Sequence, residues 1–112
     1  VILPEAAENS RPSWFGFLIS VRADSGLDRN QVTKYIEAHN IQTRLLFSGN
    51  LIKHPCFDQM RGGEGYRICG ELTNTDFIMN NTFWVGVYPG MTDEMIDHMA
   101  SVIKDAVNEG TL

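Results

Sequence analysis

The pattern of hydrophobic and polar positions predicts three short β-strands. Strongly apolar residues recur at every second position from Phe15 to Val21, with Gly16, Leu18 and Ser20 between them, a period of two that is typical of a strand with one buried face. Residues 41–47 alternate in the same way. Residues 83–88 are almost continuously apolar, which predicts a central strand that is covered on both faces.

Spacings of three and four residues predict helices between and after these strands. The first helix is expected after Asp28, a suitable N-cap, and before Asn40, which tolerates the left-handed conformation that ends many helices. A short helix is predicted from Thr73 through Met79, with Thr73 and Asp76 as a weak capping pair.

The last helix is expected to have Thr92 as its cap and to end before Gly110. Its predicted core stripe consists of Ile96, Met99, Val102, Ile103, Ala106 and Val107. The succession of a strand, a helix and a second strand over residues 15–47 favours a right-handed crossover. The order of elements predicts an α+β fold, in which a small mixed sheet of about three strands has helices packed mainly on one face.

Composition and charge narrow the class of protein. The 112 residues are 43% hydrophobic and 21% charged, which suits one globular domain. The net charge of -5 offers no basic field for a polyanion, so nucleic acid is not an expected partner. No apolar stretch approaches the ~20 residues of a membrane span, and no secretion signal is evident. We therefore expect a cytoplasmic protein without a membrane partner.

The first residues have a different character. They read VILPEAAENSRP, without an initiator Met and without any periodic pattern. This predicts a linker over residues 1–12, joined to a missing large domain, and a carboxy-terminal small domain over residues 13–112.

Residues with reactive side chains do not form a recognisable catalytic or metal site. Cys56 and Cys69 lack a CxxC spacing and a nearby His pair, so buried or half-buried free thiols are favoured. The three lysines fall on helix surfaces or in a polar loop, which disfavours a Schiff-base role. A near-helical methionine series favours packing at a core or subunit interface over a cofactor site; its members are Met91, Met95 and Met99.

Arg44 is the main candidate for a ligand contact. It faces away from the apolar side of its strand, and in the simpler interpretation it only extends into solvent. Ser48, Gly49 and Asn50 follow the strand and offer a hydroxyl, an amide and free backbone donors. Together with a guanidinium, this corner would suit a phosphate or a carboxylate.

Two stretches carry a family resemblance: TRLLFSGNLIKHPCF, residues 43–57, and YRICGELTNTDFIMNNTFWVGVYPGMTDEMIDHM, residues 66–99. They resemble the carboxy-terminal small domain of DegT/StrS-type sugar aminotransferases, which have the aspartate-aminotransferase fold. Within that superfamily the chain is most similar to CDP-4-keto-6-deoxy-D-glucose 3-dehydrases of lipopolysaccharide and dideoxysugar biosynthesis. The reason is that residues 47–51, FSGNL, stand where the aminotransferases have a Tyr-Pro-Pro-Leu-His-like run.

The resemblance implies a homodimeric enzyme that uses pyridoxamine or pyridoxal phosphate and a [2Fe-2S] cluster. Such an enzyme removes the 3-hydroxyl of a CDP-4-keto-6-deoxyhexose, with electrons from a partner reductase. Both cofactors would be held by the large domain, so residues 1–112 alone are expected to be inactive and to contain no catalytic, cofactor-binding or metal-binding residue. The residues expected to line the substrate side are Arg44, Phe47, Ser48, Asn50, Asn81 and Trp84.

Three alternatives stay open from the sequence. The chain could be the small domain of a pyridoxal-phosphate-dependent nucleotide-sugar aminotransferase, which would differ in having Lys instead of His at the cofactor. It could also be a stand-alone α+β module whose Arg44 corner binds a small molecule. A third role is dimerisation through the methionine-rich last helix.

Overall fold

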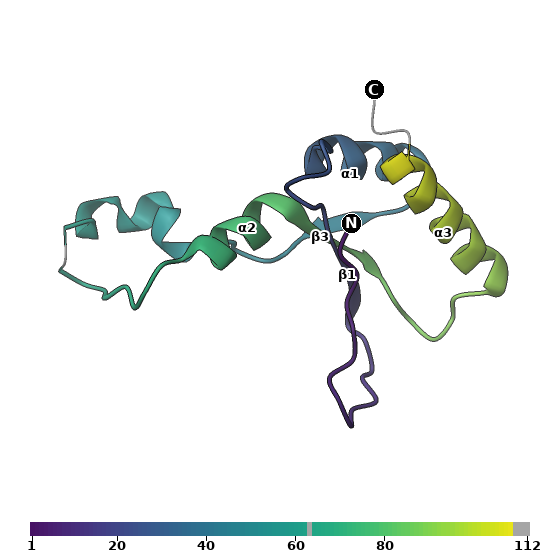
Figure 1. The fold of residues 1–112 in the computed structure, drawn as a ribbon, viewed down its shortest axis with the longest axis horizontal. Coiled ribbons are helices and arrows are strands. Elements are labelled where there is room, and N and C mark those ends of the chain that lie inside the picture. Colours follow the sequence, from purple (N-terminus) through teal and green to yellow (C-terminus); the bar gives the residue numbers. More distant parts are fainter. Residues whose placement is uncertain (63, 109–112) are drawn as a thin grey trace.

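The computed structural model describes residues 1–62 and 64–108. Gly110, before which the last helix is expected to end, lies outside the described residues, as does Gly63. Along the chain (Figure 1) the elements are β1 (Gly16–Ser20), α1 (Arg29–Ala38), β2 (Thr43–Leu45), the 3₁₀ helices η1 (Leu51–Lys53) and η2 (Pro55–Met60), α2 (Thr73–Asn81), β3 (Thr82–Gly86) and α3 (Asp93–Asn108).

The three strands form one sheet in the order β1-β3-β2. Both β1 and β2 pair with β3 in antiparallel orientation, so they run parallel to each other on its two sides. The α+β class, the three strands and the central place of β3 are therefore confirmed. The expectation of a mixed sheet is wrong, because β3 enters between the two parallel strands and makes each adjacent pair antiparallel.

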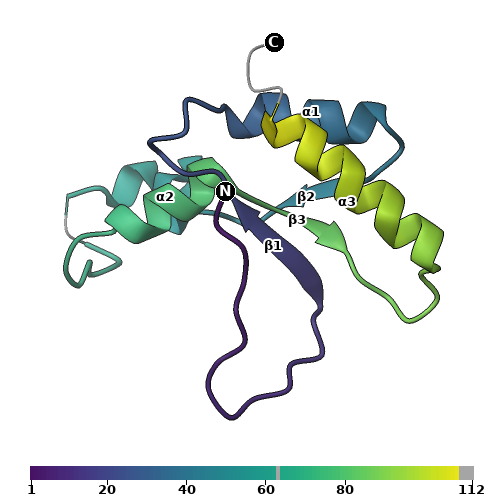
Figure 2. The same cartoon turned by 45° about the vertical axis from the view of Figure 1, so that its right-hand side comes forward.

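The hydrophobic core lies between the sheet and the two helices α1 and α3, which share one side of it (Figure 2). Its buried members are Ile19, Val21, Val32, Ile36, Ile41, Phe83, Val85, Val102 and Ala106. Because side chains alternate along a strand, Phe83 and Val85 point into this core while Trp84 points to the opposite side. Neither α1 nor α3 covers that opposite side (Figure 2), so the prediction that β3 is covered on both faces stays a prediction.

Local capping explains where α1 and α3 begin and end. The Asp28 carboxylate accepts the Asn30 N–H at 2.9 Å, and Asn40 has a φ of 65°, as expected for the residue that closes α1. Thr92 Oγ1 accepts the Met95 N–H at 3.2 Å at the start of α3. The predicted cap of α2 is wrong, because that helix begins after Leu72 without any capping side chain.

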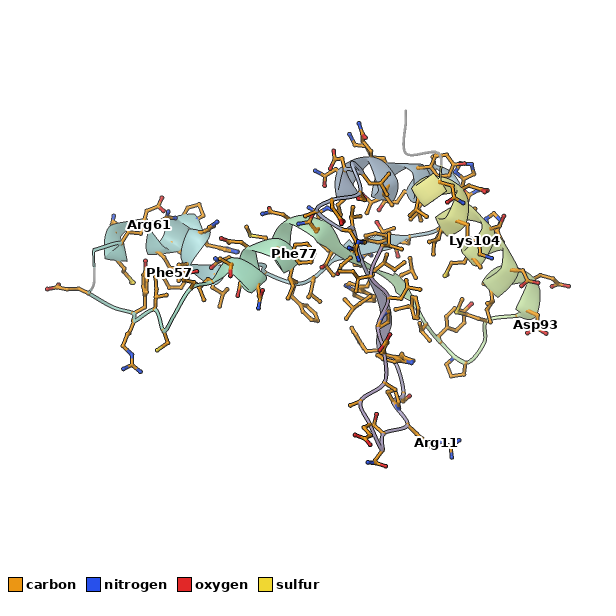
Figure 3. The ribbon with its side chains drawn as sticks, viewed as in Figure 1. Arg11, Phe57, Arg61, Phe77, Asp93 and Lys104 are labelled. Atoms are coloured by element: carbon orange, nitrogen blue, oxygen red, sulfur yellow. The ribbon has the colours of Figure 1, made fainter. Side chains whose placement is uncertain are left out.

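Residues 51–62 and 64–72 form an arm that projects from the sheet; Phe57 and Arg61 mark it in Figure 3. Within the arm, the rings of Phe57 and Tyr66 meet edge to face at 5.9 Å. The radius of gyration of the chain is 16.8 Å, well above the roughly 13 Å of a compact chain of this length. Cys56 and Cys69 are exposed free thiols on the arm, so the expectation that they are buried is wrong.

The start of the chain touches the outer edge of β1. The N–H groups of Ile2 and Ser20 each donate to the other residue's carbonyl, at 2.7 and 3.0 Å, and the residues between them loop away from the sheet (Figure 1). The assignment of residues 1–12 to a linker stays a prediction. None of the helices in the described ranges is both long enough and apolar enough to span a bilayer.

Candidate functional site

Arg44 lies on the side of the sheet opposite the core. Its direct neighbour across the strands is Trp84, whose partner on the other edge is Leu18. The Arg44 side chain is exposed, and its Nη1 donates to the carbonyl of Thr43 at 3.1 Å. None of the ion pairs in residues 1–62 and 64–108 includes Arg44. The guanidinium therefore keeps most of its donors available for an anion.

An open groove of about 400 Å³, which we call the Arg44 groove, extends from β2 and β3 to the first turns of α3. Its characteristic lining residues are Arg44, Trp84, Tyr88, Met91, Met95 and Met99. The indole N–H of Trp84 donates to the Leu45 carbonyl at 3.3 Å, which fixes the ring beside Arg44. A guanidinium next to aromatic rings and flexible thioethers suits a ligand that joins an anion to a planar or apolar body.

The methionine series and the apolar stripe of α3 divide between this groove and the core. All three methionines line the Arg44 groove, and Met99 also packs against the core, in agreement with one of the predicted roles. Ile96 is 49% exposed, so its predicted place in the core stripe is wrong. The first turns of α3 reach beyond the sheet, which is why they leave apolar side chains uncovered.

Phe47 and Ser48 line a second groove of about 320 Å³, between the end of β2 and α2. Phe47 is 76% exposed and lies beyond the end of β2, so its predicted position on a buried strand face is wrong. The six candidate residues consequently do not form one site. Arg44 and Trp84 belong to the first groove, and Phe47 and Ser48 to the second.

The chain turns sharply between the two grooves. The Gly49 N–H donates to the Leu46 carbonyl at 3.3 Å, and Phe47 has a φ of 43°, a left-handed conformation that side chains rarely adopt. Strain of this kind costs about 1 to 3 kcal/mol and persists only where the surroundings hold it. One such restraint comes from His54, whose Nε2 donates to the Ser48 carbonyl at 2.6 Å.

Asn50 is 2% exposed and belongs to a small polar cluster that we call the corner latch, made of Asn50, Lys53 and Asp76. Asn50 Nδ2 donates to Asp76 Oδ1 at 2.9 Å, and Lys53 Nζ lies 2.8 Å from the same oxygen. Hydrogen bonds from Lys53 and then from Asn50 hold the pKa of Asp76 below its ordinary value. The Asn50 side chain thus fastens the turn to α2 and does not face either groove.

Asn81 also uses its side chain inside the protein. Its Nδ2 donates to the Phe77 carbonyl one helical turn earlier, at 3.0 Å, and its own carbonyl accepts the Val21 N–H at 2.9 Å. A substrate contact by Asn81 stays a prediction. Sequence reasoning missed the roles of Lys53 and Asp76, because no local pattern indicates that these residues meet Asn50 in space.

Residues 1–104 match the model of the DegT/DnrJ/EryC1/StrS aminotransferase family. The chain belongs to this family. A dTDP-4-dehydro-2,6-dideoxy-D-glucose 3-dehydratase of Saccharopolyspora spinosa is 50% identical over 107 residues, which is 96% of this chain and 22% of that protein. The lipopolysaccharide biosynthesis protein RfbH of Salmonella typhimurium is 50% identical over 103 residues, 92% of this chain and 23% of RfbH.

A solved structure agrees with this membership. The E. coli GDP-4-keto-6-deoxy-D-mannose-3-dehydratase with bound hydrated PLP matches with a TM-score of 0.75 and 25% identity, over 90% of this chain and 25% of that one. The resemblance expected from residues 43–57 and 66–99 is confirmed. This DegT/DnrJ/EryC1/StrS chain spans about a quarter of the length of the relatives it matches.

Neither the Arg44 groove nor the second groove is lined by a lysine that could form a Schiff base with pyridoxal phosphate. Lys53 is held by Asp76, and Lys34 and Lys104 are exposed on helices. In residues 1–62 and 64–108, no three side chains of the His, Cys, Asp or Glu type are grouped so that they could hold a metal ion. What these residues can do chemically is bind and orient an anionic ligand.

Proposed function

We propose that the chain is the carboxy-terminal small domain of a nucleotide-sugar 3-dehydratase that depends on pyridoxamine or pyridoxal phosphate. The observation that carries this proposal is 50% identity, over nearly the whole chain, to a sugar 3-dehydratase and to RfbH. The reaction is removal of the C3 hydroxyl of a CDP-4-keto-6-deoxyhexose in lipopolysaccharide or dideoxysugar biosynthesis. The proposed full-length enzyme is a cytoplasmic homodimer that also holds a [2Fe-2S] cluster and receives electrons from a reductase.

Residues 1–112 supply binding groups to this enzyme and no catalytic group, so alone they are inactive. Arg44 donates to a phosphate oxygen of the sugar nucleotide, and Trp84 packs beside it; this assignment is supported by the exposed guanidinium and the adjacent indole. Phe47 and Ser48 contact the substrate from the second groove. Asn50 and Asn81, whose amides are bonded within the protein, act by holding the backbone near these contacts.

The first test is to read the parent gene upstream of the codon for Val1 and to purify its full product. Incubated with a 4-keto-6-deoxyhexose linked to CDP, a pyridoxamine phosphate supply and a reductase system, the product should release the C3 hydroxyl, seen by mass spectrometry. The same assay with the dTDP and GDP sugars identifies the nucleotide. Loss of a hydroxyl from none of them would contradict the proposal.

An aminotransferase is the second candidate, because the family that matches residues 1–104 is named for that activity. Incubation of the same full-length protein with an amino donor and a 4-keto sugar nucleotide distinguishes the two. Formation of an amino sugar without loss of the C3 hydroxyl favours the aminotransferase. A gene that begins shortly before Val1 and encodes no upstream domain favours the stand-alone binding module.

A further inference from the structure

One side of the sheet carries a flat apolar surface that we call the bare face, centred on Phe15, Leu18 and Trp84. Leu18 and Trp84 are direct cross-strand neighbours, and the rings of Phe15 and Trp84 lie 5.2 Å apart, tilted by 42°. A Cβ on Gly16 would lie 2.2 Å from Cε3 of Trp84, so the indole rests directly on the backbone of β1. The missing side chain keeps the surface flat, as an extended contact requires.

The bare face is unlike the solvent side of an ordinary antiparallel sheet. A sheet with one solvated side alternates apolar residues inside with polar residues outside. Here the outward row across the sheet is Leu18, Trp84 and Arg44, with one charge at its end, and Phe15 beside it is 76% exposed. Leu18 and Trp84 are half-buried, so this apolar row stays partly open to solvent, and contiguous apolar surface left open in this way marks an interaction site.

The lengths of the relatives indicate what covers it. The two proteins that are 50% identical to this chain over the matched segment are about four times as long, because that segment is 22% or 23% of each. The E. coli structure, with the same fold at a TM-score of 0.75, is likewise matched over 25% of its length. In these relatives the corresponding sheet is therefore one part of a much larger chain.

We infer that the bare face is the surface against which the rest of the full-length polypeptide packs, with Phe15 and Trp84 as its anchors. This inference rests on the proposed function, which requires such a polypeptide. It also explains the Arg44 groove, because Trp84 belongs to both surfaces. A docked domain walls the open side of the groove and excludes water there, which strengthens the attraction between Arg44 and an anion.

The test is hydroxyl-radical labelling of the full-length protein, read residue by residue by mass spectrometry and compared with the same protein unfolded in guanidinium. Phe15 should be protected at least roughly fivefold, because the core of an interface is fully buried. Ile96 is the matched control, since it is apolar, 49% exposed and on α3, the helix that covers the other side of the sheet. The protection of Ile96 should stay at about twofold, because about half of its surface is already exposed.

A pair of variants adds a second measurement. Phe15→Asp should raise the labelling of Trp84 toward its unfolded value, whereas Ile96→Asp should leave it unchanged. Protection of Phe15 equal to or smaller than that of Ile96, each measured relative to the unfolded protein, would overturn the inference. Protection that disappears on dilution would also overturn it, because the covering partner would then be a second copy.

The activity assay on the same preparation separates this inference from the proposed function. An active dehydratase in which Phe15 is freely labelled would contradict the docking surface and leave the proposed function standing. A protein in which Phe15 is protected but neither dehydratase activity nor a cofactor signal is found would support the docking surface and contradict the proposed function.

Discussion

Arg44 and Asn50 are six positions apart, yet the structure uses their polar groups in opposite ways. Asn50 is 2% exposed, and its side-chain amide donates to Asp76. Arg44 is exposed, forms none of the ion pairs among the described residues, and lines an open groove. The difference teaches that a satisfied buried amide reports on stability, whereas an exposed cation beside aromatic rings reports on binding.

The largest effect on the latch side is expected from Gly49→Ala. Gly49 has a φ of 65°, and a Cβ there would lie 2.6 Å from Met79 Cγ, so the change adds backbone strain and a clash. The free energy of unfolding should fall by roughly 2 to 4 kcal/mol, measured by urea unfolding. Gly26→Ala is the matched control, because Gly26 has a φ of 74° and open space around it. An equal loss in both variants would show that the clash with Met79 contributes nothing.

On the binding side, Arg44→Gln should leave the unfolding midpoint within error and raise KM for the sugar nucleotide in the full-length enzyme. A charge-assisted hydrogen bond contributes about 1.5 to 3 kcal/mol, which corresponds to an increase of roughly 10- to 150-fold. Arg22→Gln serves as the control, since Arg22 is already paired with Asp24 at 3.0 Å. A destabilised Arg44→Gln protein with normal KM would show that Arg44 contributes to stability and not to binding.

Asn50→Ala should do the reverse and reduce stability before it affects binding. Removing the amide leaves Asp76 without one of its two donors and opens space in a buried site, at a cost of about 1 to 3 kcal/mol. Thermal unfolding measures the loss, and substrate KM should change less than in Arg44→Gln. If KM rises as much as for Arg44→Gln while the unfolding midpoint is retained, Asn50 contacts substrate after all.

The smallest effect is the pH dependence of the corner latch. Because the pKa of Asp76 is lowered in the folded protein, its ionised form stabilises the fold above the ordinary value of 3.8, and this stabilisation is lost as the pH falls through the lowered folded pKa. Asp76→Asn should therefore flatten the acid limb of unfolding midpoint against pH. Parallel curves for the two proteins would mean that the ionisation of Asp76 does not contribute.

Local signals in the sequence were sufficient for both ends of α1 and for the start of α3, but not for the start of α2. Asp28, Asn40 and Thr92 cap or close their helices as predicted, because capping joins residues only two to four positions apart. The ends of the strands were harder to predict from the sequence. Alternation continued to Phe47, but β2 ends at Leu45, since a strand lasts only as long as its partner β3 offers hydrogen bonds.

The amino-acid sequence by itself determined the α+β class, where α1 begins and ends, where α3 begins, the resemblance to a family and the interest of Arg44. Tertiary structure alone decided that Asn50 meets Asp76, 26 positions away, and that the indole of Trp84 lies beside Arg44 on the uncovered side of the sheet. The physical reason is that caps and periodicity act over one or two helical turns. Contacts between distant segments depend instead on which strand enters the middle of the sheet, and here the last strand did.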